Sequence, residues 1–90
     1  MGYSTRQLTK LLRKLGYLED RGRGKGSHIR LYLEHGGRQL RATFLPGSDE
    51  EIREGVFAEV LRQTSLTRTD LDEIKAKRFG KEEYLRRLGL

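Results

Sequence analysis

Residues Gly22 to Leu33 read Gly-Arg-Gly-Lys-Gly-Ser-His-Ile-Arg-Leu-Tyr-Leu. The first half alternates glycine with basic residues, which is typical of a flexible loop that can approach an anion closely. From Ser27 onward, apolar and polar residues alternate strictly, and this period predicts a β-strand with one buried face. His28 lies where the loop becomes the strand. The fold therefore depends on what pairs with this strand and what covers its apolar face.

Two neighbouring segments supply strands for a sheet. Residues 17–21 precede the glycine loop and predict a short first strand. Glu34–Gly37 contains a Gly-Gly pair, which provides the positive φ angles of a tight hairpin turn. Residues 38–44 then predict a third strand, and Pro46-Gly47 ends the sheet. These segments predict a three-stranded antiparallel meander.

The alternation also predicts which strand residues face the core. The apolar positions are Ile29, Leu31, Leu33, Leu40, Ala42 and Phe44. If they share one face, then His28, Arg30, Tyr32 and Arg41 share the opposite surface or line its edge. An imidazole, two guanidinium groups and a phenol can bind and act on a phosphodiester. Exposed strand residues are often polar without a further role, so this pattern alone does not establish a phosphodiester-binding site.

An amphipathic helix is predicted before the sheet. Ser4 and Gln7 have the spacing of a capping box, and Gly16 is suited to the position just after the helix end. The apolar face consists of Leu8, Leu11, Leu12 and Leu15. The remaining sides carry Arg6, Lys10, Arg13 and Lys14. The helix is expected to pack its leucines on the sheet and to expose its basic residues.

The second half of the chain predicts further helices. Ser48 and Glu51 form another possible capping box that starts a turn or short helix through Ile52. The clearest helix follows Gly55, with an apolar stripe of Val56, Phe57, Val60 and Leu61. Thr67 or Thr69 can cap a helix carrying Leu71 and Ile74, and Gly80 precedes a last amphipathic segment with Tyr84, Leu85 and Leu88. The order is α-β-β-β-α with added helices, an α+β layout that is also the topology of the double-stranded-RNA-binding domain.

Composition restricts the classes of function. The net charge is +6, and residues 1–44 hold ten Lys or Arg against three acids, whereas residues 45–90 hold nine against ten. A basic front half favours an anionic partner, most often a nucleic acid, although a solvated basic surface explains the charge equally well. No apolar run is long enough to span a bilayer, so we expect a cytoplasmic protein without a membrane partner.

Small-molecule cofactors and metals are not expected. Gly-Lys-Gly-Ser superficially resembles a nucleotide-binding loop, but the required spacing is absent and a strand follows where a helix should. The chain has no cysteine and only two histidines, which leaves few metal ligands. Lys25, Gly26 and Ser27 are therefore not interpreted as a nucleotide site; they suit an anion-binding loop, and a plain hairpin loop explains them as well.

Several segments together resemble the HicA family of toxin endoribonucleases. The similarity runs from Ser4 to Leu12, through Leu15-Gly16-Tyr17, to Gly26-Ser27-His28, and resumes in residues 55–66. The helix-Gly-aromatic opening followed by a Gly-Ser-His strand start is moderately specific as a combination. The resemblance divides the chain into a HicA-like domain with a double-stranded-RNA-binding-like fold, residues 1–66, and a C-terminal helical extension, residues 67–90.

The resemblance implies an mRNA-cleaving toxin that is neutralised by a HicB-like antitoxin, with the family's essential histidine at His28. An imidazole has an ordinary pKa of about 6.5, so it can accept or donate a proton in metal-independent RNA cleavage. The residues expected to bind RNA are Lys10, Lys14, Lys25, Gly26, Ser27, Arg30, Tyr32 and Arg41, with the cations neutralising phosphate and Tyr32 stacking on a base. His35, in the turn, is expected to be a surface residue.

Two alternatives remain open from the sequence. Many HicA members carry a second histidine where this chain has Ile29, and a Pro-x-His where it reads Pro46-Gly47-Ser48. These differences suit a non-catalytic RNA-binding module of the same fold. A protein-interaction domain whose C-terminal helices dock a partner is the other alternative.

Overall fold

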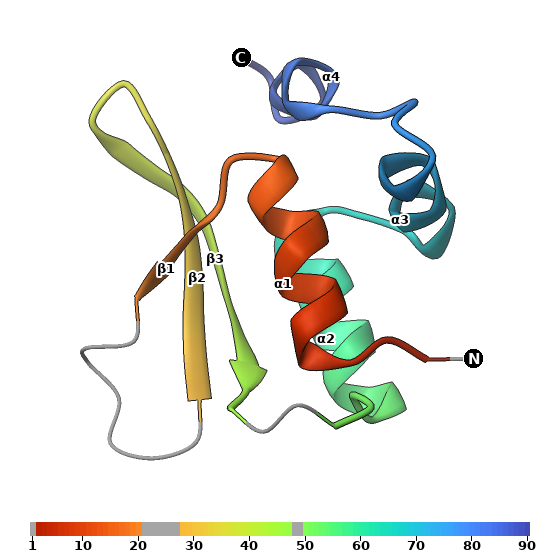
Figure 1. The fold of residues 1–90 in the computed structure, drawn as a ribbon. Helices are drawn as coiled ribbons and strands as arrows, with labels where there is room; N and C mark the ends of the chain where they lie inside the picture. The colour runs from red at the N-terminus through yellow and green to blue at the C-terminus, as the bar shows by residue number, and fades with distance from the viewer. Residues whose placement is uncertain (1, 21–27, 48–49) are drawn as a thin grey trace.

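The computed structural model describes residues 2–20, 28–47 and 50–90. Its elements, in chain order, are α1 (Thr5–Lys14), β1 (Leu18–Asp20), β2 (His28–His35), β3 (Arg38–Pro46), α2 (Glu54–Thr64), α3 (Arg68–Lys75) and α4 (Lys81–Arg87). Figure 1 shows the sheet on one side of the molecule and α1 and α2 together on the other side. The predicted α+β layout, with α-β-β-β-α followed by added helices, is confirmed.

The three strands form the predicted antiparallel meander in the order β1-β2-β3. Gly36 and Gly37 connect β2 to β3 with φ angles of 61° and 79°. Positive φ at both positions is the geometry of a two-residue hairpin loop, which glycine adopts without a steric penalty. Leu18 pairs with Tyr32 on one side of β2, and Ile29 pairs with Leu45 on the other.

The first helix begins and ends where the sequence predicts. The Ser4 hydroxyl accepts a hydrogen bond from the backbone N–H of Gln7, and the Gln7 side chain accepts one from the backbone N–H of Ser4. Gly16 follows the helix with a φ of 105°. The four predicted leucines of this helix are all buried, together with Ile29, Leu31 and Leu33 of β2. This shared burial fixes α1 against the inner face of the sheet.

The second helix packs mainly on β3, with Phe57 and Val60 buried. Val56 was predicted to belong to the apolar stripe, but it is 39% exposed, so that assignment is wrong. Ile52 donates its backbone N–H to the carbonyl of Tyr3, which ties the segment before α2 to the start of the chain and does not form a helix. The predicted cap at Ser48 lies outside the described residues.

The predicted face of β3 is also wrong. Thr43 and Leu45 are fully buried, whereas Phe44 is 53% exposed. Two causes explain the difference: the register pairs Thr43 and Leu45 with buried Leu31 and Ile29, and the Thr43 hydroxyl reaches the Gln63 side-chain oxygen at 2.6 Å. A polar side chain with a partner can be buried, so hydrophobic alternation misassigned this strand.

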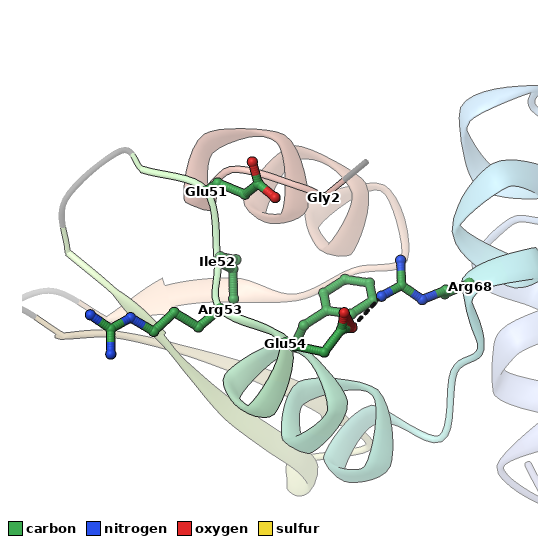
Figure 2. Close-up of a pocket in the computed structure, with 7 residues that line it drawn as sticks. Gly2, Glu51, Ile52, Arg53, Glu54 and Arg68 are labelled. Carbon is green, nitrogen blue, oxygen red and sulfur yellow. Dashed lines mark hydrogen bonds and ion pairs between the residues drawn. The ribbon is translucent and has the colours of Figure 1, made fainter.

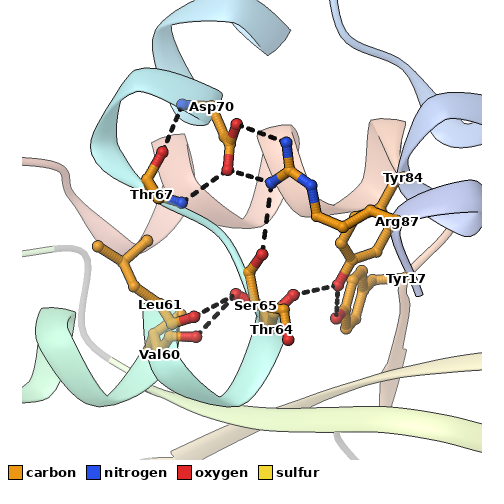
Figure 3. A network of polar contacts seen from close by, with 9 residues as sticks. All are labelled: Tyr17, Val60, Leu61, Thr64, Ser65, Thr67, Asp70, Tyr84 and Arg87. Carbon is orange, nitrogen blue, oxygen red and sulfur yellow. Dashed lines mark hydrogen bonds and ion pairs between the residues drawn. The ribbon is translucent and has the colours of Figure 1, made fainter. Parts of the chain in front are cut away.

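The C-terminal helices share the core of the preceding domain. Thr67 caps α3, Gly80 precedes α4, and Leu71, Ile74 and Tyr84 are buried in the same cluster as the leucines of α1. The Tyr84 hydroxyl donates to the carbonyl of Thr64 and lies 2.6 Å from the Tyr17 hydroxyl (Figure 3). Burial raises the pKa of both phenols, so both stay neutral and hydrogen-bonded.

An ion pair joins α3 to α4 beside these tyrosines. The Arg87 guanidinium forms two hydrogen bonds with the Asp70 carboxylate (Figure 3), one of them 3.1 Å long. Burial disfavours the charged form of Asp70, but the hydrogen bonds from Arg87 and Thr67 outweigh it and lower the pKa of this carboxyl. A two-pronged contact of this kind orients the last helix as well as stabilising it.

Candidate functional site

His28 is the first residue of β2 and lies opposite Pro46, the last residue of β3. Its side chain is exposed. It therefore lies at one end of the sheet, next to the segment that connects β1 to β2. Lys25, Gly26 and Ser27, the predicted anion-binding loop, lie outside the described residues.

Arg30 and Tyr32 follow His28 at alternate positions of β2 and share its outer face, away from α1. The Arg30 guanidinium lies over the Tyr32 ring at 4.8 Å from the ring centre, and it is 3.6 Å from the Asp20 carboxylate. It also donates a hydrogen bond to the Gln39 side chain. Arg30 is therefore already engaged by three neighbours, and a phosphate would have to compete with them.

Arg41 does not join this group, and the prediction that it shares the surface of His28 is wrong. It pairs with buried Leu33, so its side chain lies on the helix-covered side of the sheet. There its positive charge acts on Tyr17 and Tyr84, where it partly offsets the rise in their pKa. Alternation along β3 grouped Arg41 with the polar outer residues, but its register with Leu33 sets the face, and register is fixed by pairing between strands.

Phe44 takes a place on the outer face that the sequence did not predict. It pairs with Arg30, and Pro46, two residues later, pairs with His28. Phe44 is thus the diagonal neighbour of His28, a relation that brings Cβ atoms within about 8 Å. Alternation along residues 40–44 assigned Phe44 to the core, so its exposed position was not predicted from the sequence.

The outer face is electrostatically mixed. A shallow hollow on it is lined by Asp20, Arg30, Tyr32, Glu34, Gln39 and Phe44. Within the described residues, two carboxylates accompany one guanidinium in this lining. The surface offers aromatic rings for stacking, but its local charge does not favour a polyanion.

A second hollow lies between α1 and the start of β2. Its lining residues are Thr5, Arg6, Thr9, Lys10, Arg13, Glu19, Ile29 and Gly47. The described part of this lining has three cations and one carboxylate, and the Arg13 guanidinium reaches Glu19 at 3.3 Å. Lys10, one of the predicted RNA-binding residues, belongs to this groove. Lys14 does not; it lines a neighbouring hollow between α1 and α3 together with Lys75.

A fourth pocket lies beside the N-terminus, and none of the predicted site residues is in its described lining. Gly2, Glu51, Ile52, Arg53, Glu54, Phe57 and Arg68 line it. Figure 2 shows Arg68 reaching across to Glu54, with which it forms an ion pair, while its guanidinium lies 4.4 Å from the centre of the Phe57 ring. These contacts connect α3 to α2 and pair the charges of Arg68 and Glu54.

Within residues 2–20, 28–47 and 50–90, no three His, Cys, Asp or Glu side chains come close enough to hold a metal ion. None of the helices in these ranges has the length and apolarity needed to cross a bilayer.

Comparison with known proteins identifies the family. Neither the curated proteins nor the solved structures include a significant match to this chain. One family, described as the HicA toxin of bacterial toxin-antitoxin systems, matches residues 5–66. The match runs from the first residue of α1 to just beyond α2 and includes β2, with His28 at its start. The chain therefore belongs to the HicA family of bacterial toxins.

Proposed function

We propose that this toxin is a metal-independent endoribonuclease that cleaves mRNA in the cytoplasm with His28 as its catalytic residue. The observation that carries this proposal is the position of His28: an exposed imidazole at the end of the sheet, within the family-matched region. A reacting group must be reachable by a polymer that is too large to enter a closed cavity. His28 meets this requirement at the start of β2.

The chemistry follows from the substrate. The 2′-oxygen of the ribose forms a bond to the adjacent phosphorus, and the bond from phosphorus to the 5′-oxygen of the next nucleotide breaks. The 2′-hydroxyl loses a proton and the leaving oxygen gains one, and His28 supplies one of these two transfers. The expected products are a 2′,3′-cyclic phosphate and a free 5′-hydroxyl.

The cleavage reaction itself provides the first test. Purified toxin should cut a single-stranded RNA in the presence of excess EDTA, and it should leave the same RNA intact when every 2′-hydroxyl is methylated. Electrophoresis with mass spectrometry of the fragments measures both results. Loss of cleavage in EDTA that returns with added magnesium would contradict the proposed mechanism.

The outer-face aromatic residues support base stacking beside His28. Phe44 lies diagonally from His28, and Tyr32 lies farther along the same face. A stacked base contributes about 1–3 kcal/mol to binding. Phe44→Ala is therefore expected to weaken RNA binding about 5-fold to 150-fold, whereas Phe44→Trp should retain it. Fluorescence anisotropy with a labelled RNA measures the affinity. Equal binding by both variants would show that Phe44 does not contact the RNA.

A HicB-like antitoxin is the proposed protein partner. Toxins of this family function in pairs with an antitoxin. The exposed Phe44 and the partly exposed Tyr32 next to His28 are suited to burial by a protein that blocks the site, because aromatic residues are enriched at interface centres.

The second candidate function is an RNA-binding module without cleavage. It is favoured by the engagement of Arg30 with Asp20, Gln39 and Tyr32, which leaves this cation less free for a scissile phosphate. Salt-dependent RNA binding without any fragment formation would identify it.

A further inference from the structure

We propose that the groove between α1 and the start of β2 binds the phosphodiester backbone of RNA next to the nucleotide at His28. This inference rests on the proposed function for its substrate and adds a binding site for the flanking strand. The groove begins at the catalytic end of the sheet: Ile29 follows His28, and Gly47 follows Pro46, the register partner of His28.

The charges around His28 favour this groove over the outer face. Among the residues that the structure describes, the outer hollow has two carboxylates and one guanidinium, whereas the groove has three cations and one carboxylate. A polyanion that reaches His28 is therefore attracted along α1 and not along Arg30 and Tyr32. The aromatic residues of the outer face remain available to a base, so backbone and base contact different sides of the strand end.

The spacing of the cations suits a linear polymer. Arg6, Lys10 and Arg13 follow one another at intervals of four and three residues, which places them on one face of α1. At a rise of 1.5 Å per residue they extend over about 10 Å, which is the length of about three nucleotide steps at the roughly 3.4 Å axial spacing of a nucleic-acid strand. Lys10 has no acidic partner among the residues that the structure describes.

A buried hydroxyl in the groove wall is the second observation. Thr9 is 9% exposed, and its Oγ1 has no hydrogen-bond partner within the described parts of the chain. An unpaired buried hydroxyl is costly, and valine would fill the same volume without that cost. Threonine in a helix has two accessible χ1 rotamers, and rotation exchanges the hydroxyl and methyl positions. We assign this hydroxyl a role as a donor to a phosphate oxygen in the groove.

Two substitutions in a cleavage-deficient background test the site. In the full chain carrying His28→Ala, Lys10→Gln is expected to weaken binding of a fluorescein-labelled 12-nucleotide single-stranded RNA about threefold to tenfold. It should also lower the salt slope by about 0.7, the value for one lost phosphate contact. Thr9→Val should weaken binding about threefold while leaving the urea midpoint unchanged or higher, because an unpaired hydroxyl is removed.

Arg86→Gln provides the matched control, because it removes one exposed positive charge from α4, which Figure 1 places away from the start of β2. Equal losses for Lys10→Gln and Arg86→Gln would overturn the proposal, since net charge alone would then explain binding. Unchanged affinity of Thr9→Val would overturn the role of its hydroxyl. A glutamate dodecapeptide that displaced the RNA at equal concentration would instead identify a protein-docking groove.

These measurements distinguish a failure of the proposed RNA-binding groove from a failure of the proposed cleavage activity. If the groove variants lose RNA binding but the toxin with intact His28 never cleaves RNA, the binding site stands and the proposed activity fails. If cleavage is found but the groove variants bind and cleave normally, only the groove is refuted.

Discussion

Replacing His28 by alanine is expected to lower the rate of RNA cleavage about 100-fold to 10,000-fold, the range typical of a lost general acid or base. The imidazole is exposed at the start of β2, so its removal leaves the core intact and should change the free energy of unfolding by less than about 0.5 kcal/mol. Cleavage of labelled RNA under single-turnover conditions and urea unfolding of the same preparation measure the two quantities. Expression of the variant should also permit normal bacterial growth.

His35 provides the matched control. It ends the same strand, is also exposed, and lies at the hairpin turn, opposite Arg38. His35→Ala should therefore cleave RNA and arrest growth as the unmodified toxin does. If His28→Ala and His35→Ala were equally active and equally toxic, the catalytic assignment would be wrong. The toxin would then need another reacting group or would act by binding alone.

Replacing Tyr84 by alanine is expected to destabilise the fold by about 3–5 kcal/mol, the usual cost of deleting a large buried aromatic ring. Tyr84 is fully buried, lies 6.1 Å from Tyr17 between ring centres, and donates its hydroxyl proton to the carbonyl of Thr64. A domain of this size has a total stability of only about 5–15 kcal/mol, so the variant should lose a large fraction of it. Equilibrium urea unfolding followed by circular dichroism measures the change.

Two variants separate the ring of Tyr84 from its hydroxyl. Tyr84→Phe keeps the ring and should cost about 1–3 kcal/mol, because the Tyr17 hydroxyl and the Thr64 carbonyl lose a buried partner. Arg86→Ala, on the exposed side of the same helix, should change stability by less than about 0.5 kcal/mol. If Tyr84→Ala were as stable as Arg86→Ala, then α4 would not be part of the cooperative core.

The C-terminal helices contact residues within the family-matched region. The match ends at residue 66, yet Tyr17 before β1 and Thr64 at the end of α2 both bond to Tyr84 in α4. Tyr84→Ala is therefore expected to remove stabilising contacts from segments on both sides of residue 66. In this toxin, the extension stabilises the elements that hold the sheet.

Local signals determined much of the fold. The Ser4 and Gln7 capping box, the leucine face of α1 and the Gly36-Gly37 turn each depend on a few neighbouring residues, and all three were predicted correctly. Thr67 was one of the two residues predicted as the cap of α3. They work because capping hydrogen bonds, positive φ angles and helical periodicity are properties of short segments. The location of His28 at the start of a strand was predicted in the same way.

The tertiary structure alone decided which side of β3 faces the helices. Alternation predicted an outward Arg41 and an inward Phe44, but the register pairs Arg41 with buried Leu33 and pairs Phe44 with Arg30. Gln63 supplies the hydrogen-bond partner with which Thr43 is buried. By itself, the sequence of residues 22–33 determined a strand that begins at an exposed histidine. Whether cations, carboxylates or aromatic rings surround that histidine depends on cross-strand register and helix packing, which are set by contacts between distant residues.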